Sequence, residues 1–308
     1  MTSTGETPQS PDAADSGTWP LGDRQVSRLG FGAMRLTGTA AFHAGTPRDR
    51  DGSIAVVRRA VELGVNHVDT AAFYFSSLRS ANEIINAALA PLGDADVLVA
   101  TKVGPRRDRD GQWAEAARAD ELRGDVEENL RQLGRDHLDL VYLRNMRWDS
   151  LAEHFGALAE LREAGMIRHL GLSDVTVQQV AEARAVAPVV SVQNRFSLGH
   201  DKSAEVLRYC GQEGIAFVPF FAIAGNRAGS AASDSAESAE PAEVLAVAEA
   251  HGATPQQIRL AWTLAQGPHV LAIPGTGDLG HLEANIAAGA FRLTPAEIAS
   301  LESVYAHA

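Results

Sequence analysis

Cysteine is nearly absent from this sequence, which has a single one, Cys210, among 308 residues. One thiol excludes an intramolecular disulfide and any metal site built from several cysteines, and no metal is expected elsewhere. Long apolar runs are also missing, because none approaches the roughly 18 residues that a membrane span needs. Residues 1–15 have neither a basic start nor an apolar stretch, so no secretory signal is expected. The sequence therefore predicts a cytoplasmic protein with no membrane partner, in which Cys210 is a buried, inert thiol.

Basic residues are outnumbered, with 27 Lys and Arg against 39 Asp and Glu and a formal net charge of −12. Nucleic acids and anionic membranes bind clustered Lys and Arg, so neither is expected as a partner. Aromatic residues make up only 6% of the chain, whereas hydrophobic residues as a whole make up 45%. The composition therefore predicts a large core of Ala, Val and Leu, and it is compatible with a locally positive pocket.

The chain divides into a leader and one folded unit. Residues 1–17 are rich in Thr, Ser, Pro, Gly and Asp and have no apolar period, which predicts a disordered leader. We expect residues 18–308 to form a single domain. It begins with the pair Gly22-Asp23 between short extended pieces, which is typical of a tight β-hairpin.

Strands and helices alternate through the rest of the chain. Apolar strands followed by amphipathic helices indicate a parallel sheet that is covered by helices. Because eight strands are predicted, we expect an α/β fold of the (β/α)8 TIM barrel type with an N-terminal β-hairpin, and a doubly wound open sheet is the alternative. The predicted strands are 29–34, 65–70, 97–102, 138–143, 167–173, 189–193, 215–220 and 269–273, and the predicted helices are 51–63, 82–89, 120–133, 151–164, 175–186, 203–213, 241–251, 255–266, 279–288 and 295–306.

Residues 275–280 read Gly-Thr-Gly-Asp-Leu-Gly, the G-x-G-x-x-G pattern of a dinucleotide-binding turn. A Rossmann unit would need a second strand after this pattern, whereas only helices are predicted before the chain ends. In a barrel the same glycines follow the eighth strand, where phosphate sites form at the N-terminus of a helix. Both interpretations predict a phosphate-binding loop.

Residues 224–240 follow the seventh predicted strand and consist almost entirely of Ala, Gly, Ser, Asp and Glu. A segment of this composition buries little surface, so it is predicted to be mobile. Its place beside the phosphate-binding loop leaves two interpretations open, a lid that folds over a ligand or a plain insertion.

Three residues with acid–base chemistry follow the ends of neighbouring strands. Asp69 lies near the end of the strand at 65–70, Tyr74 comes five residues later, and Lys102 ends the next strand. An ammonium beside a phenol favours the phenolate, and a carboxylate would hold that ammonium in place, so the phenol can donate a proton to an oxygen. Each residue alone has an ordinary interpretation, as a turn cap, a half-buried aromatic or a solvated lysine. Their coincidence at adjacent strand ends favours catalysis.

With these residues the chain resembles the aldo-keto reductases, from about Trp19 to Tyr305. Its opening motif and the end of its fourth strand also resemble a bacterial branch of pyridoxal reductases. The matching motifs are Gly30-Phe31-Gly32-Ala33-Met34-Arg35, Asp69-Thr70-Ala71 with Tyr74, Thr101-Lys102, Gly171-Leu172-Ser173, Val192-Gln193, Pro219-Phe220, Ile273-Pro274-Gly275-Thr276 and His281-Leu282-Glu283-Ala284-Asn285.

The resemblance implies an enzyme that uses NADP(H) to reduce an aldehyde or ketone to an alcohol. Tyr74 would be the proton donor, with Asp69, Lys102 and Arg144 as the other catalytic residues. The family usually contacts the 2′-phosphate through an arginine; here His281, only partly charged at neutral pH, stands in its place, so NADPH is expected and NADH stays open. The implied cofactor-binding residues are Met34, Asp69, Ser173, Gln193, Phe220, Gly275, Thr276, His281 and Asn285.

Two positions depart from the family pattern. Arg144 stands where a histidine usually closes the fourth strand, and arginine can donate hydrogen bonds but cannot act as a base. Arg144 is expected either to clamp the substrate or to serve as a structural ion-pair partner. The second departure is Asp174, which replaces the asparagine that usually supports the nicotinamide amide.

The expected partner is a small-molecule carbonyl compound, and the protein is expected to be a monomer. Phe73, Phe75 and Trp148 favour a flat aromatic or cyclic substrate unless they serve only in packing. Two other functions stay open. One is an NADPH-binding barrel with little turnover that acts as a redox sensor or assembly subunit, and the other is a barrel isomerase or aldolase in which Lys102 forms a Schiff base.

Overall fold

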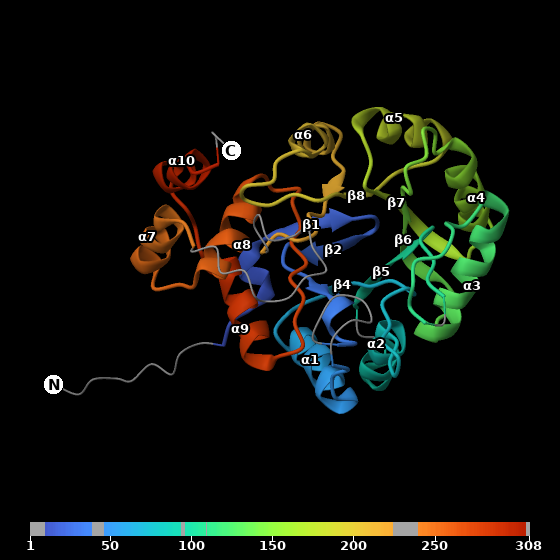
Figure 1. Cartoon of the computed structure of the whole chain (residues 1–308), viewed down its shortest axis with the longest axis horizontal. Helices are drawn as coiled ribbons and strands as arrows, with labels where there is room; N and C mark the ends of the chain where they lie inside the picture. Colours follow the sequence, from blue (N-terminus) through green and yellow to red (C-terminus); the bar gives the residue numbers. More distant parts are fainter. Residues whose placement is uncertain (1–9, 39–45, 94–95, 109, 224–239, 306–308) are drawn as a thin grey trace.

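The computed structural model describes residues 10–38, 46–93, 96–108, 110–223 and 240–305. Its centre is a sheet of seven parallel strands that pair in the order of the sequence, with helices on the outside (Figure 1). The strands are β3 (Phe31–Gly32), β4 (His67–Asp69), β5 (Leu98–Val103), β6 (Leu138–Arg144), β7 (Ile167–Ser173), β8 (Ser191–Gln193) and β9 (Ala216–Phe217).

The predicted eighth strand, 269–273, joins the two edges of this sheet. Val270 forms a parallel bridge to Phe217 of β9, and Ala272 forms one to Leu29 just before β3. Backbone hydrogen bonds of 2.9 Å, from Leu271 to Phe217 and from Gly30 to Ala272, hold both sides. The sheet is therefore closed, which confirms the barrel over the doubly wound open sheet, although the last strand pairs only through single bridges.

Ten helices surround the barrel in the described part of the chain, each within three residues of its predicted bounds. Threonine side chains cap α5, α8 and α10 in capping boxes, which satisfy amide groups that the first turn leaves unpaired. The helices are α1 (Arg50–Glu62), α2 (Ala81–Leu89), α3 (Leu122–Leu133), α4 (Ala152–Glu163), α5 (Val177–Val186), α6 (Ala204–Gln212), α7 (Ala242–His251), α8 (Pro255–Ala265), α9 (Leu279–Ala287) and α10 (Pro295–Ser303).

Two expectations from composition can be compared with these helices. Within the described ranges, none of them combines the length and the apolar character that a membrane crossing requires. Cys210 in α6 is fully buried, and burial raises the pKa of its thiol to about 12. At neutral pH the thiol is protonated, so the predicted buried and inert cysteine is confirmed.

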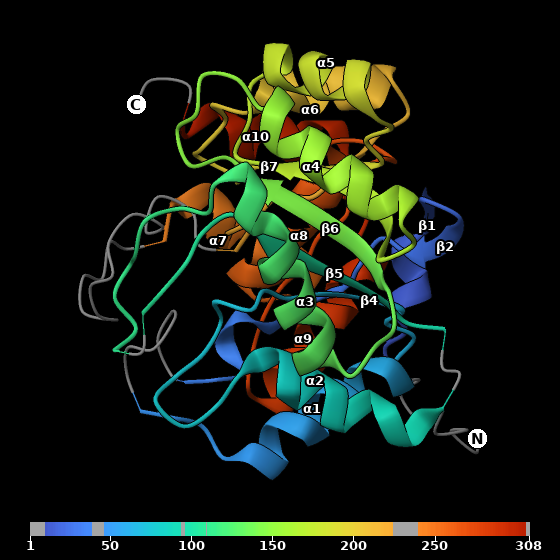
Figure 2. The ribbon, with the colours of Figure 1, turned by 90° about the vertical axis from the view of Figure 1, so that its right-hand side faces the viewer.

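The predicted hairpin consists of β1 (Thr18–Leu21) and β2 (Arg24–Ser27), joined by a tight turn in which Gly22 has a φ of 66°. It covers one end of the barrel, and the long loop that follows β5 lies at the opposite end (Figure 2). Leu21 and Val26 point inward and pack in one buried cluster with Leu98, Leu140 and other strand residues. The hairpin therefore closes the end at which the strands begin.

Large and small side chains alternate inside the barrel. A Cβ on Gly171 would lie 2.6 Å from the ring of Tyr142, and one on Gly30 would lie 2.1 Å from the ring of His67. Both glycines make room for a neighbouring ring, as interior layers of barrels require. The Tyr142 hydroxyl pairs with Ser191 at 2.8 Å. His67 has no hydrogen-bond partner for its ring among the described residues, and burial lowers its pKa to about 4.

The folded chain begins earlier than the sequence predicted. Residues 13–16 form a 3-10 turn, η1 (Ala13–Ser16), in which Ala13 and Ser16 are buried. The amide of Ala13 donates to Leu63 at 2.8 Å, and the hydroxyl of Ser16 accepts from Leu29 at 2.9 Å. The prediction of a disordered leader is therefore wrong for residues 13–17, because this segment packs beneath the barrel wall. Residues 1–9 lie outside the described ranges.

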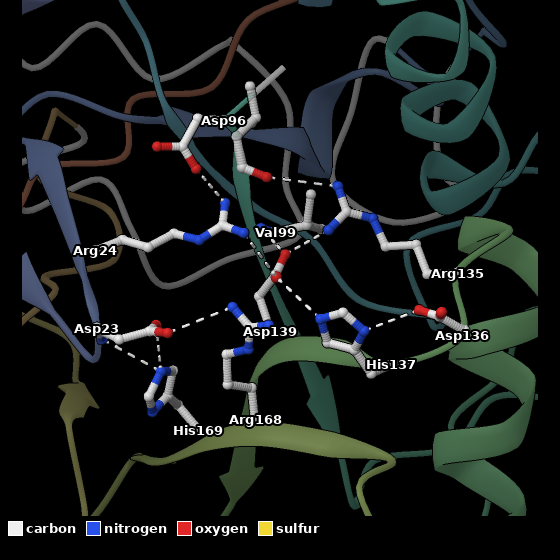
Figure 3. A network of polar contacts seen from close by, with 11 residues as sticks. Asp23, Arg24, Asp96, Val99, Arg135, Asp136, His137, Asp139, Arg168 and His169 are labelled. Atoms are coloured by element: carbon white, nitrogen blue, oxygen red, sulfur yellow. Dashed lines mark hydrogen bonds and ion pairs between the residues drawn. The ribbon is translucent and has the colours of Figure 1, made fainter. Parts of the chain in front are cut away.

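An ionic network lies where the hairpin meets the strand starts (Figure 3). Its centre is the buried carboxylate of Asp139, which accepts the amide of Val99 at 2.9 Å and pairs with Arg135. Arg24 of β2 lies 3.9 Å from the same carboxylate and pairs with Asp96 at 2.6 Å. The hairpin is thus tied to the barrel by charge as well as by apolar packing.

We predict that Asp139→Ala lowers the free energy of unfolding by about 1.5–3 kcal/mol, because the buried amide of Val99 and the guanidinium of Arg135 lose a charged acceptor. Urea unfolding measures the change. Asp136→Ala is the matched control: its carboxylate pairs with His137, but its side chain is 95% exposed, so a change within about 0.5 kcal/mol is expected. Equal losses in the two variants would contradict a central role for Asp139.

Candidate active site

Polar side chains gather where the parallel strands end. Asp69 is the last residue of β4, Arg144 of β6, Ser173 of β7 and Gln193 of β8, and Lys102 lies one residue before the end of β5. The carboxyl ends of all barrel strands meet at one rim, which is where barrel enzymes carry their reactive groups. The structure therefore brings these predicted residues to the same end of the barrel.

Lys102 and Asp69 form a buried ion pair. The ammonium lies 2.7 and 2.6 Å from the two carboxylate oxygens and donates a third hydrogen bond to the carbonyl of Thr70 at 2.9 Å. Gln193 donates its side-chain amide to Asp69 at 2.7 Å. Three strands thus contribute to one hydrogen-bonded group, as the sequence predicted for Asp69 and Lys102. Gln193 was predicted only as a cofactor-binding residue, and its contact with Asp69 was not predicted.

Tyr74 lies in the turn after β4, directly beside this pair. Its backbone is fixed by hydrogen bonds to Ala71 at 3.0 Å and from Ala81, the first residue of α2, at 2.9 Å. The Lys102 ammonium lies 4.9 Å from the centre of the buried Tyr74 ring. The predicted group of acid, phenol and ammonium is therefore assembled.

Burial is the main influence on the Tyr74 phenol, and it raises the pKa of the phenol above its ordinary value. The charge of Lys102 and a hydrogen bond to it act in the opposite direction. For Lys102, burial favours the neutral amine, but the contacts with Asp69 and Tyr74 outweigh it and raise the pKa. The sequence correctly predicted that Lys102 favours the phenolate, but in the folded chain burial is stronger. The phenol is protonated and the lysine charged at neutral pH.

Arg107, which the sequence did not indicate, holds the segment that carries Tyr74. Its guanidinium donates to the carbonyls of Phe73 at 2.9 Å and Phe75 at 3.2 Å, on either side of the tyrosine. It also donates to Gly111 at 2.8 Å and lies 4.2 Å from the centre of the Phe75 ring. No local pattern marks this contact, because it joins residues more than 30 positions apart.

Arg144 lies among residues that were assigned to the cofactor. It donates to the hydroxyl of Ser173 at 3.2 Å and to the carboxylate of Asp174 at 3.3 Å, and its guanidinium carbon lies 5.3 Å from the centre of the Phe220 ring. Its charge also slightly favours the phenolate of Tyr74. These two bonds lie at and just beyond the long end of the normal range, so they hold the guanidinium only weakly.

Ser173 and Gln193 are buried at strand ends, and Phe220 is half-buried just past β9. The amide of Asp174 donates to the carbonyl of Gln193 at 3.1 Å, and Asp174 has a φ of 63°, a left-handed conformation that asparagine and aspartate tolerate better than most residues.

Met34 was expected at a strand end. It instead lies half-buried in the 3-10 turn η2 (Ala33–Arg35) and packs against the core.

The predicted phosphate-binding loop leads from the eighth strand position into α9. The hydroxyl of Thr276 accepts from the amide of Asp278 at 3.1 Å, and the carboxylate of Asp278 caps α9 by accepting from the amide of His281 at 2.8 Å. The side chain of His281 is exposed and that of Asn285 is buried one turn later. These contacts run within the loop, so its residues form a second group separate from Tyr74 and its partners.

Gly275 lets this loop pass close to the first strand. A Cβ at this position would lie 2.5 Å from the carbonyl oxygen of Gly32, and a side chain there would push the two backbones apart. Only α9, a short 3-10 turn and α10 follow the loop in the described residues, with no further strand. The Rossmann interpretation is therefore wrong, and the glycines belong to a barrel loop.

The segment 224–240, predicted to be a lid or an insertion, lies outside the described residues except for Glu240. Glu240 accepts a hydrogen bond from Arg259 of α8 at 2.9 Å, which fixes the chain where it enters α7.

Among the predicted rim aromatics, the ring of Trp148 stacks on that of His154 with 4.0 Å between ring centres, and the ring of Phe73 packs edge-on against that of Tyr74 at 5.1 Å.

Comparisons with known proteins agree with this geometry. The sequence profile of the Aldo/keto reductase family matches residues 28–306. The chain is 41% identical over 296 residues to the pyridoxine 4-dehydrogenase of Escherichia coli, covering 94% of this chain and 98% of that protein. It is 37% identical over 295 residues to an uncharacterized oxidoreductase of Schizosaccharomyces pombe, covering 94% and 90%.

Among solved structures, an aldo-keto reductase from Klebsiella pneumoniae in complex with NADPH has a TM-score of 0.76 and 25% identity, and the match covers 96% of each chain. The glycerol dehydrogenase of Gluconobacter oxydans has a TM-score of 0.78 and 25% identity, with 95% of this chain and 96% of that chain covered. The profile match and the near-complete coverage of these relatives together identify the family. This chain belongs to the aldo/keto reductase family.

Proposed function

We propose that this enzyme reduces a pyridoxal-like aromatic aldehyde, with Tyr74 as the proton donor. The reaction class follows from family membership: the chain is an NADP(H)-dependent oxidoreductase that reduces an aldehyde or ketone to an alcohol. The roles of individual residues rest mainly on one observation, the buried ammonium of Lys102 held between Asp69 and the ring of Tyr74.

The residues at the rim suit NADP(H). The glycine loop and the N-terminus of α9 offer backbone amides and the positive end of a helix dipole, which favour phosphate groups. Ser173 and Gln193 are buried polar groups that can bind a carboxamide, and the half-buried ring of Phe220 can stack on a flat heterocycle. When bound, NADPH supplies the hydride that the carbonyl carbon receives.

The side chains around Tyr74 would supply and control the proton. The protonated phenol donates to the carbonyl oxygen as negative charge develops there. The Lys102 ammonium then stabilises the phenolate that remains, and Asp69 keeps the ammonium in position. Asp69 also holds the amide of Gln193, so one carboxylate orients a residue of the proton-donating group and a residue of the cofactor site.

The pyridoxal-like substrate is supported by the relative from Escherichia coli, whose name states dehydrogenation of pyridoxine at position 4. Reversal of that reaction reduces a 4-aldehyde that carries a hydroxyl on the neighbouring ring carbon. Arg144 can donate to a phenolate at that position while Tyr74 contacts the aldehyde oxygen, because a guanidinium presents several donors in one plane. Asp174 and Ser173, its present partners, hold it at the rim.

The other two functions have less support. A cofactor sensor without turnover was suggested by the missing histidine, but the proton-donating group is complete without it. A Schiff-base enzyme needs a neutral amine, whereas the raised pKa of Lys102 keeps it protonated beside Asp69. The proposal also includes a cytoplasmic monomer, as the sequence predicted.

We predict that Tyr74→Phe reduces turnover by at least about 100-fold, because it removes the proton donor. Intrinsic fluorescence quenching should still report tight NADPH binding, since the ring and its packing are kept. The absorbance decay of bound NADPH on addition of pyridoxal measures turnover. Turnover close to that of the wild type would contradict the assignment of Tyr74.

The pH dependence of turnover is a separate prediction. Burial raises the pKa of Tyr74 above about 10, so the donor is protonated throughout the neutral and mildly alkaline range. The kcat for aldehyde reduction should therefore stay level up to about pH 10 and fall as the pH rises through the pKa of the phenol. A loss of kcat centred near pH 7 would show that another group limits proton transfer.

Arg144→Gln tests the contact with the substrate. We expect KM for 2-hydroxybenzaldehyde to rise about tenfold or more, because a charge-assisted hydrogen bond from the guanidinium to the phenolic oxygen is lost. Benzaldehyde lacks that oxygen and is the matched control substrate, for which KM should change by less than about threefold. Equal increases for both aldehydes would indicate that Arg144 only supports the fold or the cofactor site.

A further inference from the structure

Arg48 lies against the phosphate-binding loop, although it is far from the loop in sequence. It precedes α1, and its side chain crosses the backbone of Gly277. A Cβ on Gly277 would lie 2.4 Å from Cδ and Nε of Arg48 and 2.7 Å from its guanidinium carbon. The loop therefore has a glycine where it meets the arginine, and any larger residue would displace the guanidinium.

The guanidinium is anchored at one nitrogen. Nε of Arg48 donates to the carbonyl of Arg35 at 3.0 Å, and the carbonyl of Arg48 itself accepts from Arg79 at 2.9 Å. Among the described residues, no carboxylate lies within ion-pair distance of Arg48. The two terminal nitrogens of the side chain can therefore donate to a ligand on the loop, at little cost in reorganisation.

No other unpaired Lys or Arg among the described residues of α9 and its loop is available to bind a phosphate. Residues 275–287 contain no Lys or Arg. Arg59 reaches α9, but it is paired with Glu283 at 2.8 Å and with Glu62 at 3.2 Å. The cap of α9, Asp278, adds a negative charge beside the phosphate-binding loop.

The pKa of the Asp278 carboxyl reflects the proximity of Arg48. The amide of His281 lowers the pKa of the Asp278 carboxyl most, and the positive charge of Arg48 contributes in the same direction. Arg48 is thus close enough to reduce the repulsion between this carboxylate and an anion at this end of the helix. Arg48 and His281 therefore both lie near Asp278, the cap of α9.

We propose that Arg48 binds the 2′-phosphate of NADPH and determines the preference of this enzyme for NADPH over NADH. The ligand chemistry is that of a phosphate monoester dianion, for which an arginine with free terminal nitrogens is a strong partner. The resemblance led us to expect this charge at the position of His281 within α9, whereas in this chain it comes from the segment before α1. This inference rests on the proposed function for the location of the cofactor.

The test compares dissociation constants of the intact enzyme for NADPH and NADH, measured by quenching of intrinsic fluorescence. In Arg48→Gln we expect the constant for NADPH to rise about tenfold or more, as loss of a charge-assisted hydrogen bond implies. The constant for NADH should stay within about twofold. Arg48→Lys keeps the charge and should retain part of the preference.

Arg50→Gln is the matched control. Arg50 begins α1 two residues later, its side chain is 54% exposed, and it pairs with Asp51 at 3.5 Å. We expect this variant to bind both cofactors like the wild type. Displacement of NADPH by adenosine 2′,5′-bisphosphate and by adenosine 5′-monophosphate provides a second readout, and only the former should depend on Arg48.

Two outcomes would overturn the inference. Unchanged NADPH binding in Arg48→Gln would show that Arg48 makes no contact with the cofactor, and equal weakening of both cofactors would assign it to the pyrophosphate or to the fold. If Arg48→Gln folds poorly, the ratio of the two constants in Arg48→Met gives the same answer, because a ratio does not depend on the folded fraction. Failure of the wild-type enzyme to bind NADPH would instead refute the cofactor site itself.

Discussion

The buried ion pair between Lys102 and Asp69 is the interaction on which the rest of the site depends. Removing two charges from water is costly, and close geometry with additional hydrogen bonds is needed to offset that cost. The carbonyl of Thr70 and the amide of Gln193 supply those bonds. The donors and acceptors come from β4, β5 and β8, so the pair is fully satisfied only when these strands are brought together in the barrel. Tyr74 then lies beside the ammonium, whose nitrogen is 4.9 Å from the ring centre.

One end of the barrel carries contacts that stabilise the fold, and the other end carries the reactive groups. At the end where strands begin, the hairpin closes the interior with Leu21 and Val26, and Asp139 links it to the wall by charge. Between the ends, the rings of Tyr142 and His67 fill the interior opposite Gly171 and Gly30. The reactive groups at the other end can therefore be exchanged for a different chemistry with little effect on the core.

Cations gather at the rim of this barrel although the chain as a whole is acidic. The net charge is −12, yet Lys102, Arg144 and Arg107 lie around Tyr74, and Arg48 lies at the phosphate-binding loop. Exposed carboxylates beyond about 8 Å are screened at physiological salt, so they hardly weaken cations that are partly buried. A strongly acidic protein can thus bind an anionic cofactor, and composition alone does not reveal it.

The sequence by itself determined the barrel, its hairpin and the group formed by Asp69, Tyr74 and Lys102, because each depends on local periodicity or on the residues at and just beyond a strand end. Tertiary structure decided the features that depend on long-range contacts. It closed the eighth strand through single bridges, ordered residues 13–17 against the barrel, and let burial outweigh Lys102 in setting the protonation of Tyr74. It also placed Arg107 and Arg48 beside segments far along the chain, and no spacing in the sequence encodes such contacts, since they arise only when loops from different βα units meet at one rim.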